Sequence, residues 1–143
     1  MPLRKADAEW RGGLKDGKGS IKAESGAING QYSFSTRFEN GVGTNPEELI
    51  AAAHATCFAM VMANSLNQAG TPPEQLAVTA TCSLDRIDGK LTITAMRLDV
   101  RGRVPGVDEA TFKQVAEEGG HDCPVSRALA NNVAITVNAT LEG

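Results

Sequence analysis

The sequence predicts one domain of the α+β class, and three observations support this prediction. Short stretches in which apolar and polar residues alternate lie toward both ends of the chain, separated by glycine-rich turns. A long stretch without charged residues lies between them and has the length of a helix. The chain of 143 residues falls within the size range of one domain. We therefore expect residues 1–143 to fold as a single domain with the order βββ-α-ββ-α-α-β.

Three short strands are predicted in the first third of the chain, at residues 9–14, 20–24 and 31–38. The third has the most regular pattern, because every second position holds an aromatic residue or threonine: Tyr32, Phe34, Thr36 and Phe38. In a strand, this pattern places Arg37 on the face opposite the aromatic side chains.

A long helix is predicted from Pro46 to about residue 69. Asn45 is suited to cap it, proline is favoured at the first helical position, and the two glutamates that follow suit the first turn. Residues 49–73 contain no Asp, Glu, Lys or Arg. We therefore expect this helix to be buried on nearly every side.

The surroundings of this helix allow two interpretations, a membrane or a protein core. Polar residues within the helix and the weak lipophilicity of alanine argue against a membrane span; the polar residues are His54, Thr56, Asn64 and Ser65. In one domain of this size a sheet covers only one side of a helix. We therefore expect no membrane contact, and a partner subunit is a candidate to cover the other side.

A hairpin is predicted next, with strands at residues 76–84 and 91–104 joined by a turn at 85–89. In the second strand the phase of the apolar residues changes after Ala95, which indicates a bulge or bend.

The last part of the chain predicts two helices and a strand. Asp108 is suited to cap the first helix, and Pro124 is suited to the first position of a second, short helix. Alternating apolar residues at 133–141 predict the final strand.

Composition limits the partners and the compartment. The 14 basic and 17 acidic residues give a net charge of −3, and no basic stretch is present that would neutralise a run of phosphates, so nucleic acid is not an expected partner. The start of the sequence shows no secretory or transit pattern, so we expect a cytoplasmic protein. An odd number of cysteines without an export signal favours thiols with individual roles over a disulfide framework.

Cys57 lies in the uncharged helix, where burial would normally raise the pKa of a thiol and make it inert. Two nearby cations offer an alternative: His54, one turn earlier on the same face, and Arg37, just ahead of the helix. Arginine is the stronger candidate because it stays charged in a partly dry pocket. Glu47 is placed to hold that guanidinium by a bidentate bond, although the spacing alone favours helix capping as the explanation of Glu47.

Cys123 precedes Pro124 and is therefore the expected N-cap of the short helix, a position that lowers the pKa of a thiol. From the residues alone, Cys123 or Cys57 can be the attacking thiolate. Cys82 alternates in phase with apolar neighbours in its strand, so we expect it to be a structural core residue.

A zinc site is a further alternative, since two histidines and two cysteines make a tetrahedral ligand set: His54, Cys57, His121 and Cys123. Their spacing matches no recognised zinc finger, and the apolar helix offers few groups to orient the ligands. We therefore expect no metal and no other cofactor.

Five stretches of the sequence together resemble the OsmC/Ohr family of hydroperoxide-reducing proteins. They are Gly-Lys-Gly-Ser at 17–20, Glu-Ser-Gly at 24–26, Thr-Arg-Phe-Glu at 36–39, the block Gly-Thr-Asn-Pro-Glu-Glu-Leu-Ile-Ala-Ala-Ala-His-Ala-Thr-Cys-Phe at 43–58, and Cys-Pro-Val-Ser at 123–126. The Thr-Arg-Phe-Glu stretch and the Ala-Ala-His before the cysteine make the sequence similar to the OsmC branch in particular.

The resemblance implies a cysteine-based peroxidase that reduces organic hydroperoxides to alcohols. It implies a peroxidatic cysteine at Cys57 that forms a sulfenic acid, a resolving cysteine at Cys123 that forms a disulfide with it, and supporting roles for Arg37 and Glu47. A dithiol would reduce the disulfide, and the family points to dihydrolipoamide or a lipoylated protein. The implied fold is an intertwined homodimer with curved antiparallel sheets around a long buried central helix.

Two further expectations concern the substrate pocket and an alternative function. An apolar pocket with neighbours such as Phe58, Met60 and Met62 would favour alkyl hydroperoxides. The alternative function is a stress-related protein of the same fold that binds a small ligand or zinc without turnover.

Overall fold

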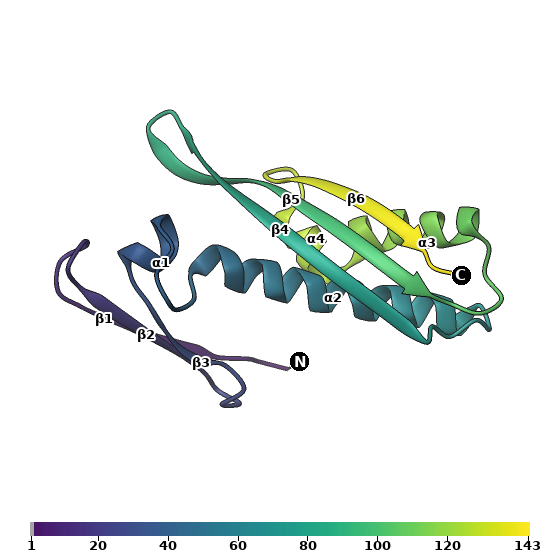
Figure 1. Cartoon of the computed structure of the whole chain (residues 1–143), viewed down its shortest axis with the longest axis horizontal. Coiled ribbons are helices and arrows are strands. Elements are labelled where there is room, and N and C mark those ends of the chain that lie inside the picture. Colours follow the sequence, from purple (N-terminus) through teal and green to yellow (C-terminus); the bar gives the residue numbers. More distant parts are fainter. Residues whose placement is uncertain (1) are drawn as a thin grey trace. The chain divides into compact units, whose positions relative to one another are not determined.

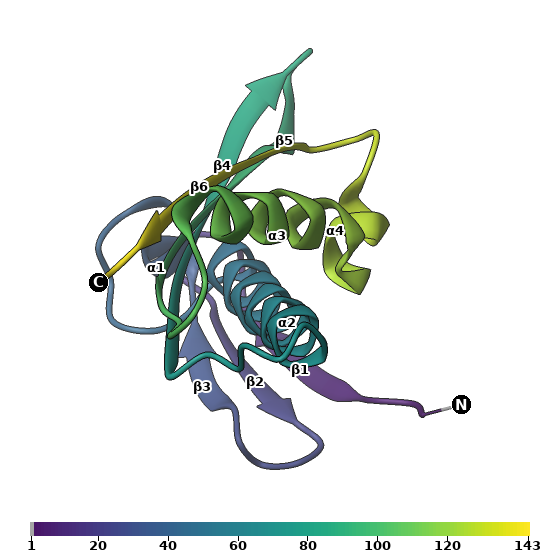
Figure 2. The same ribbon diagram turned by 90° about the vertical axis from the view of Figure 1, so that its right-hand side faces the viewer.

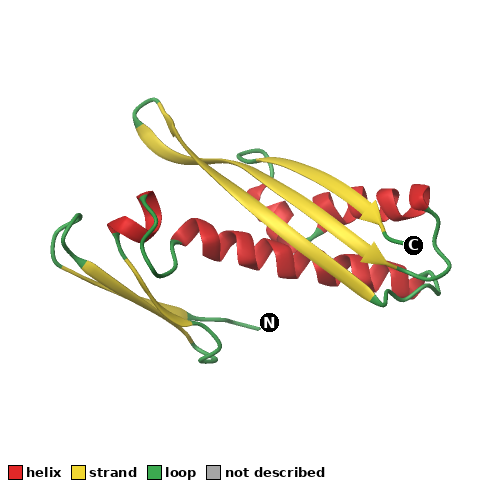
Figure 3. Cartoon of the chain, in the orientation of Figure 1, coloured by secondary structure: helices red, strands yellow, loops and turns green. Residues whose placement is uncertain are grey.

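The computed structural model describes residues 2–143 and divides the chain into two compact units, one up to Leu49 and one from Ile50 onward. Both units contain a three-stranded sheet, and the chain has the α+β composition that the sequence predicts. Figure 3 distinguishes the helices and strands by colour. The single-domain prediction stays a prediction, and each unit is described here by itself.

The first unit contains an antiparallel sheet of β1 (Ala6–Arg11), β2 (Lys18–Ala23) and β3 (Asn29–Tyr32), in that order. The side chains of Trp10 and Tyr32 pack together across the middle strand, with ring centroids 5.5 Å apart. Gly19 pairs with both of these residues, and a Cβ atom there would lie 2.5 Å from the Tyr32 ring. A glycine is therefore needed for these rings to cross the strand.

The third predicted strand is correct only up to Tyr32, because residues 34–38 form a short helix, α1 (Phe34–Phe38). A capping box starts it: the Ser33 hydroxyl accepts from the Thr36 N–H, and the Thr36 hydroxyl accepts from the Ser33 N–H. Phe34 and Phe38 are four residues apart and pack on one face of the helix, with ring centroids 4.9 Å apart. The alternating aromatic pattern thus fits a helix as well as a strand.

Helix α2 (Pro46–Gln68) begins where the sequence predicts. The Asn45 side chain accepts a hydrogen bond of 2.7 Å from the Glu48 N–H, as an N-cap does. One face is fully buried, with residues at every fourth position: His54, Phe58, Met62 and Leu66. The opposite face is exposed within this chain, as Met60 at 74% exposure shows, so the prediction of burial on nearly every side is wrong for a single chain.

Helix α2 is also long and apolar enough to cross a membrane by length and composition. Its buried residues, however, belong to a core that includes residues of a sheet and another helix, such as Leu98 and Phe112. This packing is that of a core helix in a folded protein.

The second unit is built on a sheet of β4 (Gln75–Ile87), β5 (Lys90–Arg103) and β6 (Ala134–Leu141), in that order. Strands β4 and β5 form the predicted hairpin, which turns at Asp88 and Gly89 with φ angles of 52° and 78°. These angles are those of a type I′ turn, which matches the twist of a hairpin. Strand β6 pairs with β5 in parallel, so this sheet is mixed and not wholly antiparallel.

The predicted bulge lies in β5. Ser83 pairs with Ala95 while the next residue, Leu84, pairs with Ile93, so Thr94 is the extra residue. On the side of the bulge toward its turn, the hairpin extends past the first residue of β6, Ala134 (Figure 1), because β6 pairs only with residues 95–102.

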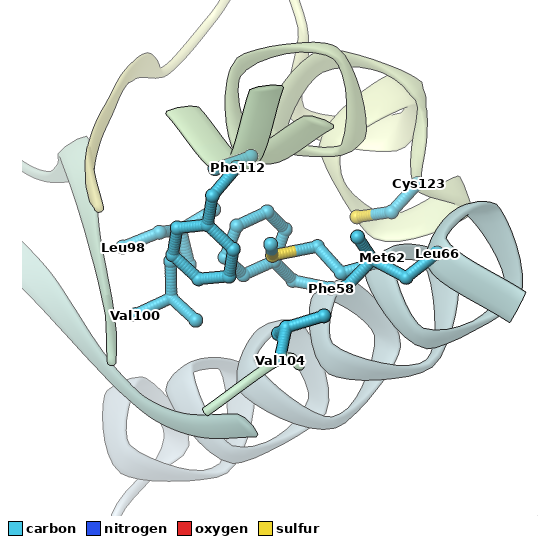
Figure 4. Close-up of a cluster of buried hydrophobic side chains, with 9 residues drawn as sticks. Phe58, Met62, Leu66, Leu98, Val100, Val104, Phe112 and Cys123 are labelled. Carbon is cyan, nitrogen blue, oxygen red and sulfur yellow. The ribbon is translucent and has the colours of Figure 1, made fainter. Parts of the chain in front are cut away.

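Helices α3 (Glu109–Asp122) and α4 (Pro124–Leu129) complete the second unit. Asp108 caps α3 by accepting from the Thr111 N–H at 2.7 Å, as predicted. Together with α2 they lie on one face of the β4–β5–β6 sheet (Figures 1 and 2). The core between these helices and the sheet contains the nine buried residues of Figure 4: Phe58, Met62, Leu66, Leu98, Val100, Val104, Phe112, Ala116 and Cys123.

Candidate active site

Arg37 and Glu47 form a bidentate ion pair within the first unit. The Arg37 Nε and Nη2 atoms donate to the two carboxylate oxygens of Glu47 at 2.9 and 3.1 Å. Glu47 is buried, whereas the Arg37 side chain keeps 34% of its surface exposed. Two parallel hydrogen bonds fix the plane of the guanidinium and leave its charge available to an anion on the open side.

The local sequence explains why these two side chains meet. Arg37 lies in the last turn of α1, not on a strand, and its guanidinium lies 5.4 Å from the centre of the Phe38 ring. This corrects the prediction that Arg37 points away from the aromatic residues. The Asn45 side chain donates to the Thr36 carbonyl oxygen at 2.9 Å while it caps α2, so one residue joins the two helices that carry the pair.

The capping of α2 also decides between the two interpretations of Glu47. The Asn45 side chain accepts from the Glu48 N–H in the first turn of α2, and the Glu48 carboxylate accepts from the Thr44 hydroxyl at 2.6 Å. The Glu47 carboxylate instead binds Arg37 through both oxygens. Its partner is therefore the guanidinium and not the helix end.

Cys57 and Cys123 meet within the second unit. Cys57 is half-buried on α2, and Cys123 is fully buried between α3 and α4, where it points toward α2 (Figure 4). The two side chains are within hydrogen-bonding reach of each other, and both are thiols, not linked by a disulfide. A pair of adjacent thiols can be oxidised to a disulfide without a large rearrangement of the backbone.

The surroundings of Cys57 in this unit favour its protonated form. Burial raises the pKa of the Cys57 thiol above its ordinary value of 9.0, and the neighbouring Cys123 raises this pKa further. A hydrogen bond from the Val125 backbone acts in the opposite direction. Among the described residues no cation contributes to lowering the pKa of Cys57.

A buried polar cluster adjoins Cys123, made of Ser126 on α4 and His54 on α2. The Ser126 hydroxyl lies 3.1 Å from the Cys123 Sγ atom and 2.7 Å from the His54 Nε2 atom. The Ser126 N–H also donates to the Cys123 Sγ atom at 3.4 Å, which is the N-cap bond that the sequence predicts. Both Ser126 and His54 are fully buried.

From the sequence, Ser126 receives no role, and His54 is considered as a neighbour of Cys57 and as a candidate zinc ligand. The signal available was the position of His54 in register with the apolar residues Phe58 and Met62, which places an imidazole on the buried face. A buried imidazole needs a polar partner, and Ser126 is the hydroxyl in the short helix beside Cys123.

The zinc ligand set is not assembled. His54 binds Ser126, whereas His121 is exposed and lies 3.8 Å from the Glu117 carboxylate. Among residues 2–143 no group of three potential metal ligands comes together.

The remaining candidates are distributed over the core and the surface. Cys82 is half-buried on β4. Phe58 and Met62 are fully buried in the core, whereas Met60 is exposed, so the expectation that these three line one pocket is wrong.

Known proteins of similar sequence point to one family. The family model described as OsmC-like protein matches residues 38–138. Peroxiredoxin OsmC of Escherichia coli (strain K12) is 44% identical over 133 residues, which are 92% of this chain and 93% of that protein. The Organic hydroperoxide resistance protein of Xanthomonas axonopodis pv. citri (strain 306) is 31% identical over 98 residues, 68% of this chain and 67% of that protein.

Solved structures show the same fold at low sequence identity. The OsmC-like protein from Mycoplasma pneumoniae superposes with a TM-score of 0.78 at 16% identity and covers 99% of both chains. An organic hydroperoxide resistance protein from Elizabethkingia anophelis superposes with a TM-score of 0.76 at 22% identity, also over 99% of both chains. The matching family model, the relative with 44% identity and the shared fold show that this chain belongs to the OsmC-like protein family, and within it to the OsmC branch of the OsmC/Ohr proteins.

Proposed function

We propose that this protein is a cysteine-based peroxidase that reduces organic hydroperoxides to alcohols, with Cys57 as the peroxidatic cysteine and Cys123 as the resolving cysteine. The observation that carries the proposal is the contact between these two thiols at the boundary between α2 and α4. The names of the relatives, a peroxiredoxin and an organic hydroperoxide resistance protein, support the same class of reaction.

In the first step the Cys57 thiolate attacks the outer oxygen of the hydroperoxide. The sulfur–oxygen bond forms as the oxygen–oxygen bond breaks, and the leaving alkoxide takes up a proton to become the alcohol. Sulfur is oxidised by two electrons to the sulfenic acid, and the peroxide is reduced by two electrons.

Arg37 supplies the positive charge that this step requires, and Glu47 orients it. Burial raises the pKa of the Cys57 thiol within its own unit, so a fixed cation is needed to favour the thiolate. The bidentate bond to Glu47 holds the Arg37 guanidinium in one orientation, while its partial exposure leaves hydrogen-bond donors available. We assign Arg37 to stabilise the Cys57 thiolate and Glu47 to hold Arg37.

In the second step Cys123 condenses with the sulfenic acid and releases water, which leaves a disulfide between Cys57 and Cys123. An external dithiol then returns both thiols to the reduced form by thiol–disulfide exchange, with two electrons from the dithiol. Dihydrolipoamide or a lipoylated protein is the proposed reductant.

The proposed assembly is a cytoplasmic homodimer. The face of α2 opposite the core is uncharged and exposed within one chain, with residues such as Ala52, Thr56 and Met60. A second copy of the chain would remove this apolar surface from water.

Mass spectrometry of the oxidised protein tests the proposal. After treatment with one equivalent of cumene hydroperoxide, we expect a peptide that contains a disulfide between Cys57 and Cys123, together with one equivalent of alcohol. The Cys123→Ser variant should stop at the sulfenic acid of Cys57, which a dimedone reagent traps. The Cys57→Ser variant should consume no peroxide.

Cys82→Ser is the matched control for these variants, because Cys82 is the third cysteine of the chain and has no role in the proposed reaction. It should form the same disulfide as the unsubstituted protein. The proposed reaction is wrong if Cys82 alone is oxidised, or if Cys57 and Cys123 stay reduced while the peroxide persists. A binding function without turnover would then be the better description.

A further inference from the structure

The cluster of His54, Ser126 and Cys123 has a geometry that core packing does not require. Ser126 lies between the other two residues, with its hydroxyl 2.7 Å from His54 Nε2 and 3.1 Å from Cys123 Sγ. All three side chains are fully buried and come from α2, α4 and the junction before α4. They form a continuous row of polar atoms that ends at the sulfur facing Cys57.

The unpaired nitrogen of His54 indicates the direction of these hydrogen bonds. The Nδ1 atom is buried and has no hydrogen-bond partner among the described residues. A buried N–H without an acceptor is more costly and rarer than a buried lone pair without a donor. The neutral tautomer with its proton on Nε2 is therefore favoured, so that Nε2–H donates to the Ser126 hydroxyl.

This tautomer fixes the role of Ser126. Because its oxygen accepts from His54, its single hydroxyl proton is free to donate to the Cys123 sulfur. The Ser126 N–H donates to the same sulfur. Two donors directed at one sulfur stabilise its negative charge more than its protonated form. Burial lowers the pKa of His54, which agrees with a neutral imidazole at neutral pH.

We propose that His54 and Ser126 form a hydrogen-bond relay that stabilises the Cys123 thiolate for its attack on oxidised Cys57. Ser126 contacts the reacting sulfur, and His54 is a positioning residue that acts through Ser126. The inference rests on the proposed function, because it assigns the relay to the second step of that reaction.

The relay step is balanced without a further reactant. The Cys123 thiol loses its proton, its sulfur attacks the sulfur of the Cys57 sulfenic acid, and the sulfur–oxygen bond of that acid breaks. The departing hydroxide takes up one proton and leaves as water. The product is the disulfide. One proton leaves the Cys123 thiol and one proton is taken up by the hydroxide, so the step balances.

Single-turnover kinetics separate the two steps of the reaction. In Ser126→Ala and His54→Leu we expect the Cys57 sulfenic acid to form at the rate of the unsubstituted protein. Disulfide formation should be about ten- to a hundredfold slower, the loss expected for one hydrogen bond to a charged group. His54→Gln should recover part of this loss, because its amide N–H is a donor that can replace Nε2–H.

A second measurement reports the ionisation of the Cys123 thiol. In a Cys57→Ser, Cys82→Ser background, Cys123 is the remaining cysteine, and ultraviolet thiolate absorbance follows its titration. Ser126→Ala and His54→Leu should shift this titration to higher pH, and His54→Gln should shift it less than His54→Leu. A purely structural role would change thermal stability and leave both the titration and the disulfide step unchanged.

His121→Gln is the matched control, since His121 is the other histidine of the chain and is exposed. It should change neither measurement. An unshifted Cys123 titration in Ser126→Ala and His54→Leu would overturn the relay, as would equal slowing of both kinetic steps. If the unsubstituted protein forms no Cys57 sulfenic acid, the proposed function fails, and the titration still decides whether the relay exists.

Discussion

His54 is an ionisable ring inside a nonpolar core, and its neutral state makes stability depend on pH. Burial lowers the pKa of His54 from its ordinary value of 6.5, while the unfolded chain retains that value. Below about pH 6.5 the unfolded state therefore binds a proton that the folded state does not bind. The stabilising effect of the neutral ring is complete above this pH and is lost as the pH falls.

We predict that the free energy of unfolding falls as the pH drops below about 6.5, with a contribution from His54 of up to about 1.4 kcal/mol per pH unit. Urea unfolding at a fixed protein concentration measures this slope. His54→Gln should have a shallower slope, because glutamine does not titrate, whereas His121→Gln should keep the slope of the unsubstituted protein. Equal slopes in all three proteins would contradict the account of His54 as a buried neutral residue.

At the scale of the elements, Asn45 connects the start of α2 to α1. Its side-chain oxygen accepts from the Glu48 N–H, and its side-chain nitrogen donates to the Thr36 carbonyl. The first bond caps the long helix, and the second positions the short helix that carries Arg37. One residue thus supports both elements that contribute to the ion pair.

Two substitutions of Asn45 separate these functions. Asn45→Ala removes both bonds and should lower the free energy of unfolding by about 1 kcal/mol or more, the usual cost of a lost N-cap. Asn45→Asp keeps a capping oxygen but loses the donor to Thr36, so it should retain most of the stability and still slow Cys57 oxidation. Urea unfolding and stopped-flow oxidation measure the two effects. The account of Asn45 is wrong if Asn45→Asp is as unstable as Asn45→Ala or oxidises at the unsubstituted rate.

The elements also show what the sequence can predict. The limits of α2 follow from Asn45, Pro46 and Gly70, and the bulge in β5 follows from the change of apolar phase, because each is a local property of the chain. Alternation at 32–38 predicts a strand where the structure has helix α1. The same residues also fit a helix, because Phe34 and Phe38 are four residues apart and pack on one face of it. The capping box of Ser33 and Thr36 stabilises the helix at this position.

The contacts among the candidate site residues were not predictable from the sequence. The family resemblance implies roles for the four residues, which stay predictions, whereas the residues alone leave the attacking cysteine undecided and favour capping for Glu47. The buried contact between His54 and Ser126 joins residues 72 positions apart, and no local pattern in a single sequence specifies such a contact. The parallel pairing of β6 with β5 is long-range in the same sense.

At the scale of the whole molecule, the residues of the proposed reaction are distributed over two units of the chain. The first unit holds the Arg37 and Glu47 ion pair, and the second holds the Cys57 and Cys123 thiols. Burial and the neighbouring thiol oppose ionisation of Cys57 within the second unit. The proposed mechanism therefore requires that Arg37 supply the positive charge that the surroundings of Cys57 lack within the second unit.

Titration of Cys57 in the assembled protein tests this claim most directly. In a Cys82→Ser, Cys123→Ser background, thiolate absorbance reports Cys57, with the other two cysteines removed. We predict that Cys57 is ionised at neutral pH, and that Arg37→Gln in the same background moves its ionisation to higher pH. A Cys57 thiol that keeps its proton at neutral pH, with or without Arg37, would contradict the account.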